Sequence, residues 1–220
     1  MQGIIFDMDG VIFDTEQVWQ DAFFTANQRF GLSLTEEFRQ STCGKSEALV
    51  RKELAIQYPE LDVPGYRNYM LQCVNDRVAA GDFAVKEGFL ELIALIKREG
   101  YRVALATSSG RLRAEHAFKV KNLDIGMFDT TVFGEDVKER SKPDPYIFQL
   151  ATQRLGLPAY ECFVLEDSIN GIESAVRSGF SAVMVVDKIP PNDYCLTHCK
   201  KIIGSLVQMP SVLREKNESN

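Results

Sequence analysis

The sequence has 220 residues, enough for one substantial hydrophobic core or for a core that carries a small inserted domain. Hydrophobic residues make up 45% of the chain, as is typical of globular proteins, and 25 basic against 31 acidic residues give a net charge of −6. This balance provides no basic field for nucleic acid, and no apolar run approaches the length of a membrane span. We therefore expect neither a nucleic-acid nor a membrane partner, and a small anionic substrate would need local cations.

The cysteines indicate a reducing compartment. There are five, an odd number without the spacing of a disulfide framework: Cys43, Cys73, Cys162, Cys195 and Cys199. No signal peptide follows the initial Met1, so we expect a cytoplasmic protein, and we expect a monomer. The segment Cys195-Leu-Thr-His198-Cys199 offers only three candidate metal ligands and no second cluster, which favours a loop with reduced thiols over a metal site.

The first predicted element is a short strand over Gly3–Phe6, an apolar run typical of a strand buried on both faces of a parallel sheet. It stops at Asp7 and Asp9, which the period of two places on the same side, and Gly10 allows a sharp turn. Ligands of open α/β sheets bind at the carboxyl ends of the strands. Two converging carboxylates at this edge favour a bound Mg²⁺.

Two other structures could explain this acidic turn. Many Asp-Gly pairs form a helix N-cap or a solvated turn, but two acids directly after a buried strand favour a ligand site. An EF-hand calcium loop has its glycine at the sixth position and a glutamate at the twelfth, whereas Gly10 is fourth from Asp7 and Val18 is twelfth. A calcium loop of that kind is therefore excluded.

The next segment, residues 15–81, is predicted to be entirely helical. Asp14 or Thr15 can cap a first helix whose apolar residues recur at helical spacing up to Gly31. Further helices are expected near residues 35–40, 46–58 and 65–80, with no second buried strand between them. We therefore predict an inserted all-α domain over residues 15–81 and an α/β core made of residues 1–14 and 82–220.

After a predicted helix over 88–98, the sequence again shows an apolar strand that ends in a polar turn before a helix. A strand over Arg102–Ala106 stops at Thr107-Ser108-Ser109-Gly110, ahead of a helix that starts at Arg111. Hydroxyl and amide donors at a strand's carboxyl end can form a phosphate cradle, although serine-rich turns are common for other reasons.

Two further strands end in charged residues. A strand over 130–134 leads to Ser141-Lys142-Pro143-Asp144-Pro145, in which the prolines fix the start of a helix over 146–155 and place Lys142 as a phosphate clamp. A lone lysine is more often a solvated charge, but its position at a strand-to-helix junction favours the clamp. The strand over 162–165 runs into Glu166 and Asp167, which would join Asp7 and Asp9 around one cation. Strands over 182–186 and 201–203 and a frayed tail over 214–220 complete the chain.

These motifs together resemble the phosphatase and phosphomutase branch of the haloacid dehalogenase superfamily. The matching segments, in family order and spacing, are Asp7-x-Asp9-Gly10-Val11-x-x-Asp14, Thr107-Ser108-Ser109, Ser141-Lys142-Pro143-Asp144-Pro145 and Glu166-Asp167-Ser168-Ile169-Asn170-Gly171. The resemblance implies a doubly wound, Rossmann-like parallel sheet with a helical cap that closes over the active site. It also implies that Asp7 attacks phosphorus to form an aspartyl-phosphate, while Asp9 protonates the leaving oxygen and later activates water.

The resemblance also assigns the remaining site residues. Thr107 and Lys142 bind the transferring phosphoryl group, and Mg²⁺ is positioned by Asp7, the carbonyl of Asp9 and the pair Glu166–Asp167, chiefly Asp167. The segment Thr42–Ser46 resembles the substrate-specificity loop of the cap, with Gly44 and Lys45 reaching the substrate beside Ser108 and Trp19. An ordinary turn, with Ser46 as an N-cap and Lys45 in solvent, explains that segment equally well.

We therefore expect a Mg²⁺-dependent phosphatase of a small phosphorylated metabolite, first a sugar phosphate. The nearest alternative is a β-phosphoglucomutase, but such mutases carry a cap histidine where this chain has Trp19 and a cap arginine where it has Glu47. The dehalogenase branch attacks carbon without metal and lacks the second acid that Asp9 supplies. A non-enzymatic binding protein is disfavoured because the set Asp7, Asp9, Lys142 and Asp167 is intact.

Overall fold

The computed structural model describes residues 2–215 and is built on a parallel sheet of six strands. In spatial order the strands are β5 (Thr130–Val132), β4 (Arg102–Ala106), β1 (Gly3–Phe6), β6 (Cys162–Glu166), β7 (Ser181–Val185) and β8 (Lys201–Ile203). Every neighbouring pair in this sheet is parallel. The strand order reverses its direction of winding at β1 and β6, which defines a doubly wound α/β fold.

Alternation along the strands divides the core into two layers. Ile4 and Phe6 of β1 belong to one cluster of buried side chains, whereas Ile5 between them belongs to the other. The first cluster includes side chains of α5 (Phe89–Arg98), α6 (Arg111–Val120) and α11 (Met209–Glu215). The second includes those of α7 (Gly134–Val137), α8 (Tyr146–Leu155), α9 (Ile169–Arg177) and α10 (Asp193–His198). The sheet is therefore covered by helices on both faces, as a buried parallel sheet requires.

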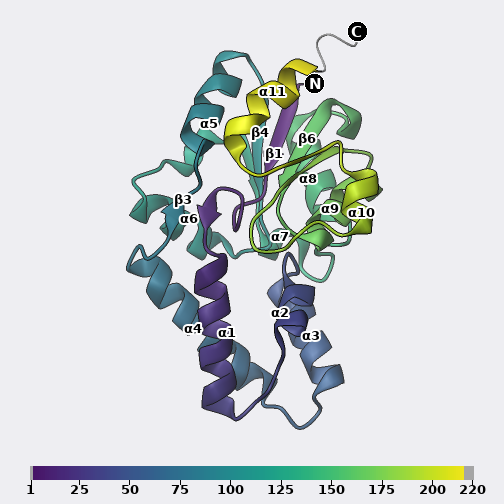
Figure 1. Ribbon diagram of the computed structural model, residues 1–220. Helices are drawn as coiled ribbons and strands as arrows, with labels where there is room; N and C mark the ends of the chain where they lie inside the picture. The colour runs from purple at the N-terminus through teal and green to yellow at the C-terminus, as the bar shows by residue number, and fades with distance from the viewer. Residues whose placement is uncertain (1, 216–220) are drawn as a thin grey trace.

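Four helices form a separate body below the sheet in the view of Figure 1. They are α1 (Glu16–Phe30), α2 (Glu36–Thr42), α3 (Glu47–Gln57) and α4 (Val63–Ala79). The chain leaves the core through β2 (Phe13–Asp14) and returns through β3 (Ala84–Val85), and these two segments pair antiparallel. An all-α cap is thus inserted into the α/β core on a two-stranded ribbon. The boundaries of 14/15 and 81/82 stay predictions.

The predicted elements of the core agree with the structure, with β4 and α8 matching residue for residue. The ribbon β2–β3 was not predicted. The prediction of a loop around Cys195 was wrong: these residues form α10, which Asn192 caps by accepting a hydrogen bond from the amide of Cys195 at 2.9 Å. The frayed tail was wrong for Arg214 and Glu215, which end α11, and residues 216–220 lie outside the described part. Among residues 2–215, none of the helices is both long and apolar enough to span a membrane.

Candidate active site

The site is built on the turn that follows β1, at the switch point of the sheet. The amide of Asp7 donates to the carbonyl of Leu165 at 3.0 Å and so extends the pairing of β1 with β6 by one residue. Gly10 has a φ of +78°, and a Cβ atom there would lie 2.1 Å from Oδ2 of Asp167. Only glycine therefore permits both the turn and the approach of the Asp167 carboxylate. The structure brings Asp7, Glu166 and Asp167 together, whereas Asp9, which was expected to join them, is not part of this cluster.

A buried lysine joins two of the predicted carboxylates. Nζ of Lys142 lies 2.5 Å from Oδ1 of Asp7 and 2.6 Å from Oε1 of Glu166, and its side chain is fully buried. Burial opposes the charge of Lys142, but Asp7 and Glu166 outweigh this and raise the pKa of the ammonium. Burial raises the pKa of Asp7 to about 7, with Lys142 opposing and Glu166 adding to the rise. Lys142 is therefore a fixed cation of the site and not a solvated charge.

Asp167 lies in a strongly negative part of the site. One oxygen each of Asp7, Glu166 and Asp167 falls within 4.8 Å of the others. Burial, followed by the charges of Glu166 and Glu16, holds the pKa of Asp167 well above its usual range. Such a cluster of carboxylate oxygens is the donor set that Mg²⁺ prefers, and a divalent cation would remove the repulsion. The residues present therefore fit a magnesium ion.

Within this cluster Glu166 has further partners. Its Oε2 accepts hydrogen bonds from the amide and the hydroxyl of Ser168 at 2.6 and 2.9 Å. Both of its oxygens are thus engaged, one by Lys142 and one by Ser168. Glu166 holds Lys142 and the start of α9 in place, in addition to whatever it contributes to a metal.

The side chain of Asp9 is held by the start of α1 and by the turn and helix that follow β4. Oδ1 accepts from the hydroxyl of Thr15 at 2.6 Å, and Oδ2 accepts from the hydroxyl of Ser109 at 2.5 Å. Nη2 of Arg113 lies 3.7 Å from the same Oδ2. Thr15 occupies the N-cap position of α1, but it makes no side-chain cap hydrogen bond because its hydroxyl is engaged by Asp9.

The turn after β4 carries Thr107, Ser108 and Ser109, and their role as a phosphate cradle stays a prediction. Thr107 is buried, its amide donates to the carbonyl of Val132 at 3.0 Å, and its hydroxyl oxygen accepts from the amide of Ser109 at 3.0 Å. The hydroxyl of Ser108 instead donates to the carbonyl of Gly44 at 2.6 Å, which is a contact with the cap. Thr107 thus lines the cavity beside Asp7, while Ser108 joins the core to the cap.

The cap loop Thr42–Ser46 is tied to the loops of the core by several hydrogen bonds. Nδ2 of Asn170 donates to the carbonyl of Cys43 at 2.7 Å, and the amide of Ser46 donates to the hydroxyl of Ser141 at 3.0 Å. Gly44 has a φ of +78°, and a Cβ atom there would lie 2.5 Å from the hydroxyl oxygen of Ser168. The loop therefore closes over the turn that carries the acids.

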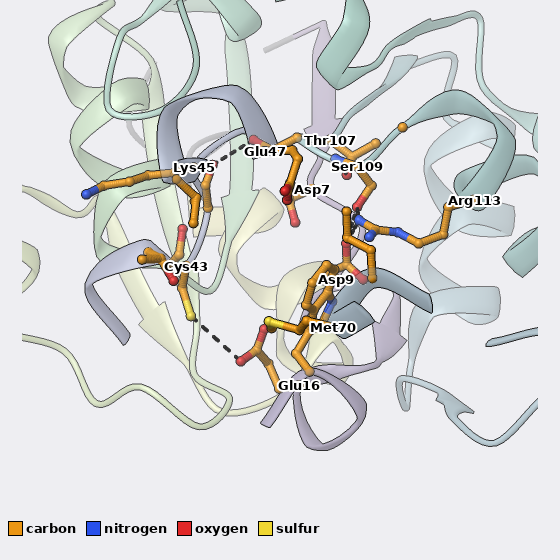
Figure 2. Close-up of a pocket in the computed structure, with 18 of the residues that line it drawn as sticks. Asp7, Asp9, Glu16, Cys43, Lys45, Glu47, Met70, Thr107, Ser109 and Arg113 are labelled. Atoms are coloured by element: carbon orange, nitrogen blue, oxygen red, sulfur yellow. Dashed lines mark hydrogen bonds and ion pairs between the residues drawn. The ribbon is translucent and has the colours of Figure 1, made fainter. Parts of the chain in front are cut away.

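The side chain of Lys45 pairs within the cap, whereas the hydroxyl of Ser46 contacts both the cap and the core, where it donates to the carbonyl of Lys138 at 3.1 Å. Nζ of Lys45 lies 2.9 Å from both carboxylate oxygens of Glu53, and Figure 2 shows the side chain directed away from the cavity. Ser46 is an N-cap of α3, accepting from the amide of Leu49 at 3.4 Å. The interpretation of Ser46 as an N-cap is confirmed, and a contact of Lys45 with substrate stays a prediction.

A cavity of about 360 Å³ lies between the cap and the core. Its core wall includes Asp7, Asp9, Thr107 and Asp167, and its cap wall includes Trp19, Gly44, Val50, Met70 and Leu71. Three arginines that were not predicted also line it: Arg39, Arg67 and Arg113. Arg113 follows the predicted cradle by a few residues in the first turn of α6, which was a usable signal, whereas nothing in the pattern of α4 marks Arg67. The fold and this site define an α/β enzyme whose candidate active site lies between the core and a helical cap.

The comparisons with known proteins give the family. Residues 1–179 match the model of the haloacid dehalogenase-like hydrolases, and the chain belongs to this family. It is 31% identical over 187 residues to the "Phosphorylated carbohydrates phosphatase" of Thermotoga maritima, covering 83% of this chain and 84% of that protein. It is 29% identical over 196 residues to "Protein CbbY" of Cereibacter sphaeroides, covering 84% of each chain. The crystal structure of a β-phosphoglucomutase from Clostridium difficile superposes with a TM-score of 0.84 at 19% identity, covering 100% of this chain and 98% of that chain.

Proposed function

We propose that this enzyme hydrolyses the phosphate ester of a small phosphorylated metabolite, first a sugar phosphate, in a Mg²⁺-dependent reaction. One observation carries the proposal. Asp7 is held by Lys142 beside Asp167 at the switch point of the sheet, on the wall of a cavity of about 360 Å³ between the cap and the core. This volume suits a small metabolite. The relative with 31% identity is named as a phosphatase of phosphorylated carbohydrates, which supports a sugar phosphate.

Asp7 is the proposed nucleophile. Lys142 holds Oδ1 of Asp7, which fixes the carboxylate and leaves Oδ2 outside that ion pair. A bond forms between an oxygen of Asp7 and phosphorus while the bond from phosphorus to the ester oxygen breaks, which gives an aspartyl-phosphate. Lys142 and Thr107 would hold the phosphoryl group in line for this attack. A Mg²⁺ bound by Asp7, Asp167 and the carbonyl of Asp9, with Glu166 beside it, would neutralise charge on the phosphoryl oxygens.

Asp9 is the proposed acid and base. It donates a proton to the departing ester oxygen, so that the alcohol leaves neutral, and then takes a proton from the water that attacks the aspartyl-phosphate. Inorganic phosphate leaves and Asp7 is restored. The hydroxyls of Thr15 and Ser109 hold the Asp9 carboxylate at the cavity wall.

Hydrolysis is proposed in preference to a mutase reaction because of Trp19. Its indole offers one N–H donor and no acceptor and does not titrate near neutral pH, so it cannot replace the cap histidine of the mutases. Glu47 argues only weakly against a mutase, because Arg67 and Arg51 contact its carboxylate at 2.6 and 2.8 Å. These arginines compensate the negative charge that would otherwise repel a second phosphate.

The test is a screen of the purified protein against phosphorylated metabolites, with and without Mg²⁺, that measures released phosphate. We expect sugar phosphates to be hydrolysed only with Mg²⁺, and we expect the variant Asp7→Asn to be inactive while it remains folded. Release of phosphate that is equal in EDTA and in Mg²⁺ would contradict the proposed role of the metal. The monomeric state and the cytoplasmic location stay predictions.

A further inference from the structure

The basic side chains of the cavity differ in how fully they are paired. Three of them have a carboxylate within 3.0 Å: Arg39 with Glu16, Lys45 with Glu53 and Arg67 with Glu47. Arg113 has its nearest carboxylate, that of Asp9, at 3.7 Å. Its Nε is buried and has no hydrogen-bond partner within residues 2–215. Arg113 is thus the least satisfied cation of the cavity wall in the described part of the chain.

The position of Arg113 is fixed by its neighbours. Its guanidinium lies over the indole ring of Trp19, 4.5 Å from the ring centroid, and Nη2 contacts the hydroxyl of Ser109. Figure 2 shows the side chain extending from the core wall into the cavity toward Asp9. Stacking on an indole holds the plane of a guanidinium and leaves its edge for planar hydrogen bonds. This arrangement is preorganised for a carboxylate or a phosphate.

The electrostatic environment also favours an additional anion. Burial lowers the pKa of Arg113, Asp9 and Glu47 oppose this, and the neighbouring charge of Arg67 adds to the lowering. Two guanidinium groups therefore act on the same part of the cavity, and one of them lacks a close carboxylate partner. A buried cation without a close anion is unfavourable, and a ligand that brings a negative charge removes this penalty.

We propose that Arg113 binds a second anionic group of the substrate, so that the preferred substrate is a phosphate ester that also carries a carboxylate or a second phosphate. The proposal rests on the phosphatase function proposed above and deepens it. Arg113 touches the carboxylate of Asp9, the proposed acid for the ester oxygen. The second anion would therefore lie on the same side of the cavity as the ester that is cleaved.

The experiment compares matched pairs of substrates by kcat/KM for phosphate release. Glycerol 3-phosphate and 3-phosphoglycerate differ by a carboxylate, and glucose 6-phosphate and glucose 1,6-bisphosphate differ by a phosphate. Each pair is measured with the wild type, with Arg113→Gln and with the control Arg111→Gln. Arg111 is the first residue of α6, two positions before Arg113, and its exposed guanidinium stacks on the ring of Phe133 at 4.3 Å. It does not line the cavity, so this control removes the same charge nearby.

We expect the wild type to prefer the more anionic member of at least one pair, and Arg113→Gln to reduce this preference about ten- to a hundredfold, the range of one charge-assisted hydrogen bond. The pair that shows the effect identifies the second anion as a carboxylate or a phosphate. Arg111→Gln should leave the preference unchanged. Because both members of a pair use Asp9, any disturbance of Asp9 cancels in the ratio. A wild type without preference in either pair, or an equal loss for both members in Arg113→Gln, overturns the proposal.

A binding measurement separates this proposal from that of phosphatase activity. Asp7→Asn and Asp7→Asn/Arg113→Gln are titrated by calorimetry, in Mg²⁺, with the same four compounds. We expect the second substitution to weaken binding of the more anionic member selectively. If phosphate is released from all compounds and no binding is selective, the inference about Arg113 fails while the phosphatase survives. If binding is selective and no phosphate is released, the phosphatase fails while the anion site stands.

Discussion

Replacement of Asp167 by asparagine is expected to stabilise the protein in the absence of metal. The carboxyl of Asp167 is only 6% exposed, and one of its oxygens lies within 4.8 Å of oxygens of Asp7 and Glu166. Its pKa is raised above that of the unfolded chain by burial and by neighbouring carboxylates. A group with a raised folded-state pKa favours folding below its unfolded pKa, and this contribution is lost as the pH rises toward the folded pKa. At neutral pH the carboxyl therefore opposes folding.

The amide of asparagine has the same shape and no charge, so the expected gain in the free energy of unfolding is about 1–3 kcal/mol in EDTA. With a urea m-value of about 3 kcal/mol/M, the midpoint should rise by roughly 0.3–1 M. Mg²⁺ at a hundred times its Kd should stabilise the wild type by about 2.7 kcal/mol, and it should stabilise the variant clearly less. The variant should also need more Mg²⁺ for phosphate release.

The assay is urea unfolding at neutral pH, in EDTA and in Mg²⁺, followed by circular dichroism. The control is Glu139→Gln, which makes the same chemical change at an exposed position and should shift the stability by less than about 0.5 kcal/mol. The reasoning is refuted if Asp167→Asn is less stable than the wild type in EDTA. It is also refuted if Mg²⁺ stabilises both proteins equally.

Three further substitutions or assays test other parts of the account. Gly10→Ala should lower both the stability and the Mg²⁺ affinity, because its Cβ would meet Asp167. The control Gly31→Ala, at φ +62° with open space around its Cβ, should lower the stability by only about 1 kcal/mol and keep activity. If the two variants had equal effects on urea unfolding and on activity, the steric argument would be contradicted. Lys142→Met should destabilise the metal-free protein by about 3–5 kcal/mol because it leaves Asp7 and Glu166 unpaired, and Lys142→Arg should lose less stability. An unchanged urea midpoint in Lys142→Met would argue against the ion pairs. With β-glucose 1-phosphate, Mg²⁺ and a trace of glucose 1,6-bisphosphate, free phosphate should form faster than glucose 6-phosphate, and the reverse order would favour the mutase.

Asp7 and the pair Glu166–Asp167 could be predicted because they end or follow strands whose preceding residues are apolar, β1 and β6. Lys142 was predicted from its place before the helix α8 and from the family motif, since the strand β5 before it is Thr-Thr-Val. Apolar strands such as β1 and β6 are recognisable locally, and the parallel sheet brings their carboxyl ends to one edge. The structure brings Asp7, Lys142 and Asp167 together as this reasoning expects. The ribbon β2–β3 could not be predicted, because two residues in each strand are too few to show a period.

Sequence patterns could not predict which way the cap side chains point, because this depends on contacts between helices. Lys45 was expected either to reach the substrate or to lie in solvent, and in the structure it instead forms an ion pair with Glu53 of α3 at 2.9 Å, so that its contact with substrate stays a prediction. Arg67 lies on α4 of the cap and Arg113 on α6 of the core, and both line the same cavity because the cap packs against this side of the core. The helix α10 could have been predicted from the sequence, since Asn192 at its start is a recognisable N-cap signal.

The central claim is that Asp7 carries the phosphoryl group. The direct measurement is a rapid acid quench of the enzyme during turnover of a hydrolysed substrate, followed by mass spectrometry of the peptide that contains Asp7. The account predicts one phosphoryl group on Asp7 in the wild type, and neither this adduct nor phosphate release in Asp7→Asn. Turnover like that of the wild type in Asp7→Asn, or a phosphoryl group on another residue, would contradict it.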